Sequence, residues 1–183
     1  MKKLITLTLS LFLCIDLFAQ EADLKLFPVV EGKVMYESIV DLNGFDAGTI
    51  HVRAFKWMLD NFKNREQIAD DLDIGQTVYK VSMESGIYTV DFTIQVDSKD
   101  NKYRYRIYDI KHTVTSQKDN AMFAKYLVNV SADTDNSIVK GELKGYSKGQ
   151  KKEAQKTIIQ VDELINKVIN SLHAAINKKA ATF

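Results

Sequence analysis

The sequence predicts an α+β fold in which one antiparallel sheet carries two helices on one face. Residues 88–97 alternate apolar and polar side chains, which is the pattern of a strand with one buried face. Residues 46–62 and 153–177 repeat apolar side chains at spacings of three and four, which is typical of helices with one buried stripe. The simplest way to bury these faces is the order strand, helix, four strands, helix, with both helices on the same side of the sheet.

The first strand and the first helix are expected close together near the start of the domain. Residues 34–40 are rich in β-branched and aromatic side chains, and Asn43-Gly44 ends the run. Asp46 is the expected N-cap of a helix that ends at about Phe62, because its short carboxylate can accept from free amides of the first turn. The apolar face expected to pack on the sheet is Val52, Phe55, Leu59 and Phe62, with Met58 beside it and Trp57 to one side.

Four further strands are expected at about residues 67–72, 77–84, 88–97 and 102–113. The third has the clearest alternation, with Phe92 and Ile94 on its apolar face. The segment 98–101 supplies a turn, so the third and fourth strands are expected to form an antiparallel hairpin. Lys102, Arg104 and Arg106 then fall on the same face as Asp91, Thr93, Gln95 and Asp97.

The last part of the chain is expected to hold a variable region and a long helix. A short helix at 121–127 and loops at 133–137 and 141–149 are the expected contents of the variable region. The long helix has a stripe shorter than three heptads, so packing on the sheet is favoured over a coiled coil with a partner helix. This stripe is Ile158, Val161, Ile165, Val168, Leu172 and Ala175.

The first residues have the layout of a secretory signal peptide. Lys2 and Lys3 precede an apolar stretch over residues 4–15, and cleavage is expected between Ala19 and Gln20. Lys2, Lys3 and Asp16 leave with this leader, so the remaining chain has equal numbers of basic and acidic side chains. The sequence therefore predicts an exported cell-envelope protein that is periplasmic or extracellular after cleavage.

The single cysteine of the chain, Cys14, lies in this leader. Lipid attachment is not expected there, because lipidation requires small residues before the cysteine and Phe12-Leu13 are large. The mature chain then has no cysteine, which excludes thiol nucleophiles, CxxC redox chemistry and cysteine-ligated zinc. The expected organisation is a signal peptide at 1–19, a strand-helix-four-strand core at 20–115, a variable loop region at 116–152 and a C-terminal helix at 153–183.

Several short phrases of the core resemble a known family. They are Phe27 to Val34 leading into Tyr36-Glu37, Ala54 to Met58 with Asn61-Phe62, and Tyr103 to Ile107 with Asp109. Over roughly residues 27–115 the chain resembles exported bacterial proteins that share a domain of unknown function with a TATA-binding-protein-like (TBP-like) fold. The resemblance implies the order β-α-β-β-β-β-α. It transfers no activity, catalytic residue or cofactor, and the name of the fold does not imply DNA binding.

The sequence offers no catalytic, cofactor-binding or metal-binding residues. His51, His112 and His173 lack the i, i+4 spacing of a metal site, so solvated histidines are expected. The acidic segments 70–75 and 133–136 lack the spacing of a calcium loop and are expected to be turns. There is also no GxSxG, P-loop or dinucleotide-binding fingerprint.

Two classes of function fit these observations. The chain has 25 basic and 24 acidic residues, a balance that does not suit a nucleic-acid binder. The first expectation is a non-enzymatic envelope module that binds a protein or another envelope component through its sheet and loops. The alternative is a binder of small apolar ligands with a pocket between the sheet and the C-terminal helix, and a hydrolase ranks third.

Overall fold

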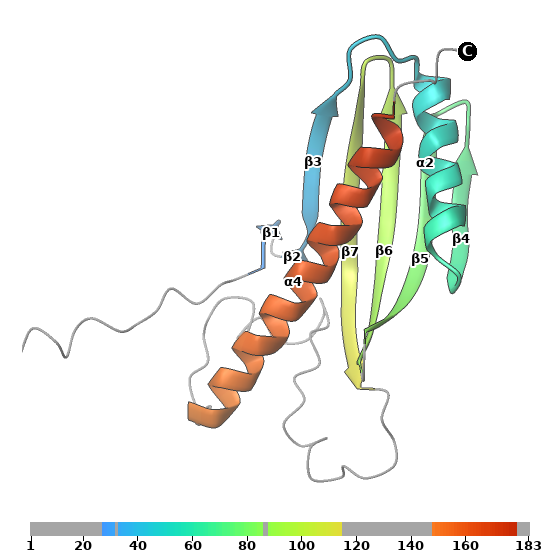
Figure 1. Cartoon of the computed structure of the whole chain (residues 1–183). Helices are drawn as coiled ribbons and strands as arrows, with labels where there is room; N and C mark the ends of the chain where they lie inside the picture. The colour runs from blue at the N-terminus through green and yellow to red at the C-terminus, as the bar shows by residue number, and fades with distance from the viewer. Residues whose placement is uncertain (1–26, 32, 86–87, 115–147, 179–183) are drawn as a thin grey trace, which may run out of the picture.

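The computed structural model describes residues 27–31, 33–85, 88–114 and 148–178. Its elements are β1 (Val29–Val30), β2 (Lys33–Val34), β3 (Tyr36–Asp41), α2 (Ala47–Asn61), β4 (Arg65–Asp71), β5 (Gln76–Ser85), β6 (Tyr88–Lys99), β7 (Lys102–Val114) and α4 (Lys148–Ile176). The strands β3-β7-β6-β5-β4 form one antiparallel sheet in that order, and β1 and β2 form a separate small hairpin. Both helices lie on one face of the large sheet, with α4 crossing it obliquely (Figure 1). The predicted α+β fold is therefore confirmed.

The start of α2 is fixed to the tip of the β6–β7 hairpin. Asp46 caps the helix as predicted, since its Oδ1 accepts from the Thr49 backbone N–H at 2.8 Å. Asp100 Oδ1 accepts from the N–H of Ala47 at 2.8 Å, and Asn101 Oδ1 accepts from the N–H of Gly44 at 2.9 Å. The hairpin tip thus satisfies backbone donors that the first turn of the helix and the preceding loop leave free.

The buried face of α2 differs from the predicted one. Val52 and Leu59 are 59% and 39% exposed, so these two members of the predicted face lie on the outer side of the helix. Met58 and Phe62 are buried as predicted, and Phe55 is partly buried against the core. The buried residues are Ile50, His51, Ala54, Trp57 and Met58, with Phe62 at the C-cap. Both stripes have helical spacing, and the one that contains Trp57 packs inward because the indole buries a large apolar area against Phe62 and the sheet. Trp57 Nε1 also donates to Ser171 Oγ at 2.9 Å, which joins α2 to α4.

The long helix confirms the predicted stripe but begins earlier than predicted. Ile158, Val161, Ile165, Val168 and Leu172 are all buried, and Ala175 packs partly buried beside them. The helix starts at Lys148 and not at Glu153, so Gly149 is helical and the predicted loop is wrong at this position. Exposed glycine lowers helix propensity without forbidding helix, which explains the difference.

A β-bulge in β7 decides which of its residues face the helices. The β6–β7 register shifts between Asp91 and Thr93, and Asp109 takes a left-handed φ of 54°. Without the extra residue, strict alternation from the buried Ile107 would point Asp109 toward the core. With it, Ile110 enters the core at 1% exposure and Asp109 stays exposed.

Some predicted features lie outside the described residues. These are the leader with its Ala19–Gln20 cleavage site and Cys14, the proposed helix at 121–127, the loop at 133–137 and residues 141–147.

Candidate functional site

The face of the sheet opposite the helices carries most of the polar side chains of β5, β6 and β7. The predicted cross-strand arrangement is confirmed, because Asp97 pairs with Arg104 and Gln95 with Arg106 in the β6–β7 ladder. Thr93 and Gln95 on this face are only 5% and 7% exposed, although both described helices lie on the other face of the sheet (Figure 1). We call this surface the open face.

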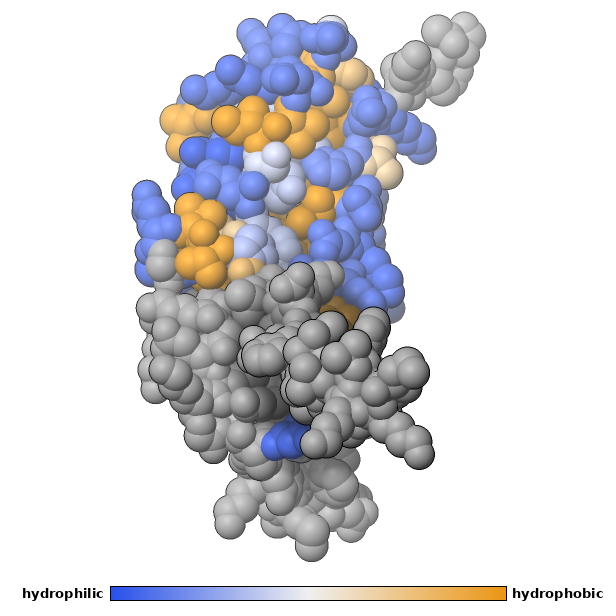
Figure 2. Space-filling model, turned by 90° about the vertical axis from the view of Figure 1, so that its left-hand side faces the viewer, coloured by the Kyte–Doolittle hydropathy of each residue, from blue (hydrophilic) through white to orange (hydrophobic). Residues whose placement is uncertain are grey.

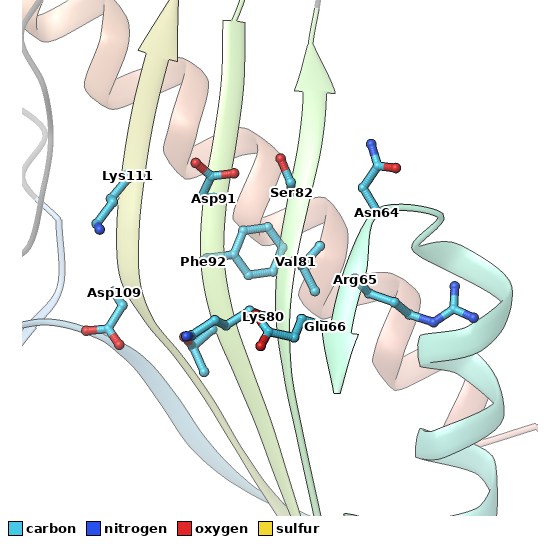
Figure 3. A pocket seen from close by; sticks show the side chains of 11 residues that line it. Asn64, Arg65, Glu66, Lys80, Val81, Ser82, Asp91, Phe92, Asp109 and Lys111 are labelled. Atoms are coloured by element: carbon cyan, nitrogen blue, oxygen red, sulfur yellow. The ribbon is translucent and has the colours of Figure 1, made fainter. Parts of the chain in front are cut away.

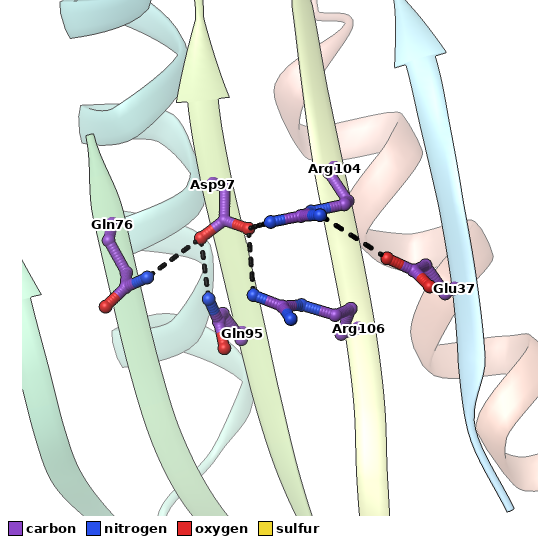
Figure 4. Close-up of polar contacts among 6 residues, drawn as sticks. All are labelled: Glu37, Gln76, Gln95, Asp97, Arg104 and Arg106. Carbon is purple, nitrogen blue, oxygen red and sulfur yellow. Dashed lines mark hydrogen bonds and ion pairs between the residues drawn. The ribbon is translucent and has the colours of Figure 1, made fainter. Parts of the chain in front are cut away.

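One end of the open face holds a closed network around Asp97 (Figure 4). Arg104 donates to Asp97 Oδ2 through Nε at 2.9 Å and a terminal nitrogen at 2.7 Å, and Arg106 donates to the same oxygen at 3.2 Å. Gln76 and Gln95 donate to Asp97 Oδ1 at 3.0 and 2.7 Å. Burial acts to raise the pKa of Asp97, but the hydrogen bonds from Gln95, Gln76 and Arg104 outweigh it and hold the pKa below its usual value. The charged groups of this network pair with one another, and we therefore assign the network a structural role.

The other part of the open face is a hollow of about 570 Å³ (Figure 3). Val81 and Phe92 form its floor. The side chains of both residues are buried in the core on the helix-covered face of the sheet. Charged and polar side chains from β4, β5, β6 and β7 form its walls. The charged ones are Arg65, Glu66, Lys80, Asp91, Asp109 and Lys111.

Within the part of the chain that the structure describes, none of these six charged groups has an ion-pair partner within 4.0 Å. The salt bridges within 4.0 Å among the described residues are those of His51 with Asp70, Arg104 with Asp97 and Glu37, and Arg106 with Asp97. Arg65 donates to the Phe62 carbonyl at the end of α2. The hollow therefore presents two ammonium groups and three carboxylates that could meet a ligand, whereas the charged groups of the Asp97 network beside it pair with one another.

Opposite charges nevertheless face one another across the strands of the hollow. Glu66 is the cross-strand partner of Lys80, and Asp91 is the cross-strand partner of Lys111. The hollow thus holds cationic and anionic groups side by side, a pattern that matches a ligand with charges of both signs.

The histidines are not solvated as predicted. His51 and His112 are 4% and 3% exposed. His51 Nε2 lies 3.0 Å from Asp70 Oδ1, and its Nδ1 lies 3.4 Å from Thr77 Oγ1, so the ring joins α2 to β4 and β5. The helical spacing that placed Val52 inward gave no sign that the adjacent His51 would find polar partners on the sheet.

The other two histidines pack against tyrosines on the helix-covered side. His112 lies against the ring of Tyr88 with ring centroids 4.7 Å apart, and burial lowers its pKa. His173 of α4 contacts the hydroxyl of Tyr103 through Nδ1. All three histidines therefore have structural surroundings away from the hollow.

Residues 72–75 of the acidic segment form the β4–β5 turn as predicted, whereas Asp70 and Asp71 are the last residues of β4. Asp71 Oδ1 accepts from the backbone N–H groups of Asp73 and Ile74 at 3.0 and 3.1 Å. Within the described ranges, no three His, Asp or Glu side chains come together in a way that could hold a metal ion. In the same ranges, no helix is both long and apolar enough to cross a membrane.

The side of the molecule that carries β3 has a different character. Hydrophobic side chains there form small patches separated by polar ones (Figure 2). Ile39 of β3 is 64% exposed, but Glu37 and Asp41 lie on the same strand and are also exposed. Such charges discourage pairing of an edge strand with another chain.

The arrangement β3-α2-β4-β5-β6-β7-α4 defines a TBP-like α+β domain with one helix-covered face and one open polar face. Residues 36–113 match the model of the DUF4468 family, a domain of unknown function with a TBP-like fold. This confirms the resemblance found in the sequence.

Solved structures support the same fold. A TBP-like protein from Parabacteroides distasonis ATCC 8503 is 16% identical, with a TM-score of 0.56 over 81% of this chain and 97% of its own. A DUF4468 family protein from Bacteroides ovatus ATCC 8483 is 19% identical, with a TM-score of 0.51 over 84% of this chain and 94% of its own. At these identities the similarity shows the fold alone. A comparison with curated proteins gave no match.

The sequence gives no sign of the hollow. Its residues come from four strands, and the chain brings them together only through the register of the sheet. The alternation of β6 correctly predicts that Asp91 and Thr93 lie on the open face. Asp109 joins them only because of the bulge, and the sequence of residues 107–112 contains no pattern that predicts a bulge.

Proposed function

We propose that this chain is an exported envelope protein whose open face is a non-enzymatic binding surface. The observation that carries the proposal is the hollow, where Lys80, Lys111 and three carboxylates lack ion-pair partners among the described residues. Unpaired charges that surround a concave surface are typical of binding sites, since a partner can complete interactions that the protein leaves open. Export remains supported by the leader pattern at residues 1–19.

A pocket for small apolar ligands between the sheet and α4 has less support. Ile107, Ile165 and Leu172 between these elements are each 0% exposed, which is the packing of a filled core. The hollow lies on the opposite face and has charged walls. We therefore place the binding surface on the open face.

The proposal is tested by native mass spectrometry of the protein purified from its own host. We expect a component that copurifies with the wild-type chain and is lost from the double variant Asp91→Asn, Lys111→Gln. The matched control is Lys56→Gln, Asp60→Asn, which also removes one charge of each sign but lies on the exposed side of α2. A component retained equally by both variants, or no component at all, contradicts the proposal.

A further inference from the structure

We infer that the hollow of the open face binds a short peptide that carries both a free ammonium and a free carboxylate group. This inference names the ligand class for the proposed binding surface and rests on that proposal. It follows from the charges of the hollow, their placement and the width of the hollow.

The charges of the hollow exclude ligands of a single sign. A purely anionic ligand would meet Lys80 and Lys111 but also Asp91, Asp109 and Glu66, and like charges in contact are costly. A purely cationic ligand would meet the two lysines. A ligand that carries one group of each sign can place its ammonium against the carboxylates and its carboxylate against the lysines.

The strands fix where these groups lie. Lys111 and Asp109 belong to β7, Asp91 to β6, Lys80 to β5 and Glu66 to β4, so both signs occur on each side of the hollow. Figure 3 shows Asp109 and Lys111 on one side, with Lys80 and Glu66 close together nearer the other. Each end of the ligand can therefore meet a group of the opposite sign.

The width of the hollow sets the length of the peptide. From β7 to β4 there are three strand spacings of about 4.8 Å, or roughly 14 Å in total. An extended chain spans about 3.3–3.6 Å per residue, so a peptide of two to four residues fits between the two sides. The volume of about 570 Å³ lies within the range usual for sites of small ligands.

The bulge of β7 supports a binding role for this place. It holds Asp109 in a left-handed conformation that non-glycine residues seldom adopt, and it keeps Asp109 beside Lys111 on the open face. Bulges often occur next to binding sites, where they redirect a side chain. The strain at Asp109 has a direct structural consequence, since this residue adds a carboxylate to the wall of the hollow.

The inference is tested by NMR titration of the full wild-type chain with three probes. These are trialanine, N-acetyl-trialanine, which lacks the ammonium, and trialanine amide, which lacks the carboxylate. We expect trialanine to shift the amide signals of Asp91, Thr93 and Lys111 with a Kd of about 1 mM or below. Each capped probe should bind about tenfold more weakly, since it loses one charge-assisted contact. Equal binding of the three probes, or no shift of these signals up to about 10 mM trialanine, overturns the inference.

The variants used for the proposed function separate the two claims. Asp91→Asn, Lys111→Gln should weaken trialanine binding about tenfold or more, and Lys56→Gln, Asp60→Asn should leave it unchanged. If trialanine does not bind but the copurifying component still depends on Asp91 and Lys111, the peptide inference is wrong and the binding surface stands. If neither holds, both are wrong.

Discussion

At the tip of the β6–β7 hairpin, the backbone and the side chain of Asn101 act on stability in opposite directions. Its φ of 61° favours glycine, whereas its Oδ1 accepts the N–H of Gly44. Asn101→Gly should leave the free energy of unfolding nearly unchanged, because it relieves about 1 kcal/mol of strain and loses a hydrogen bond worth about 1 kcal/mol. Asn101→Ala loses the bond without relieving the strain and should cost about 1–2 kcal/mol. Urea unfolding of both variants checks this, and equal losses would contradict it.

Two glycines with similar φ angles differ in the space around them. A Cβ at Gly75 would lie 2.5 Å from the Ser98 carbonyl oxygen, whereas a Cβ at Gly44 would have no atom within 4 Å. Gly44→Ala should therefore cost only the conformational term of about 1 kcal/mol. Gly75→Ala should cost at least about 2 kcal/mol more, since β5 and β6 must separate to admit the methyl group. Thermal unfolding of the pair measures the difference, and similar values would show that the turn moves freely.

His112 links stability to pH through its burial. Its pKa in the folded protein lies below the ordinary 6.5, so the unfolded chain takes up a proton first as the pH falls. The free energy of unfolding should therefore decrease below about pH 6.5. The part of this decrease that His112 causes should disappear in His112→Phe, which keeps a ring against Tyr88. The free energy of unfolding at about pH 7.5 and about pH 5.5 gives the comparison. If the wild-type chain and the variant lose equal stability, His112 does not contribute.

At the scale of elements, the sequence predicts which residues of one strand or helix share a face. It does not predict which of two apolar faces packs on the other elements, or how neighbouring strands are aligned. The alternation of β6 and the spacing in α4 predict that Ile94 and Ile165 lie in the core, and both are 0% exposed. For α2, two apolar stripes compete, and only the shape of the surface formed by β5, β6 and α4 selects the one with Trp57. The hollow could not be predicted either, because it depends on the register between four strands, which no single strand determines.

The bulge gives an element-scale prediction with a matched control. Deleting Asp109 leaves Ile107, Ile110 and His112 facing the core in regular alternation, so the chain should fold with a continuous β6–β7 ladder and a lower affinity for trialanine. Deleting Ile110 instead turns Asp109 toward the helices and should prevent folding, because an unpaired carboxylate is costly in a core. Circular dichroism and the same titration distinguish the two. Equal folding of both deletions would contradict the assigned bulge.

For the whole molecule, two surfaces of the described residues compete as the place where a partner binds. The open face is polar and holds the hollow, whereas the outer side of α2 exposes Val52 and Leu59. Exposed apolar side chains are the usual rival candidates for a partner surface, and Lys56 and Asp60 lie among these two on α2. The central claim is that binding occurs on the open face, so a measurement must compare these two surfaces within one molecule.

Hydrogen–deuterium exchange does so most directly, on the natively purified protein with its bound component and again after that component is removed. The account predicts slower exchange in the bound state at residues 80–82, 91–93 and 109–111, with no change at residues 52–59 of α2. Protection of residues 52–59 with the open face unchanged would contradict the central claim.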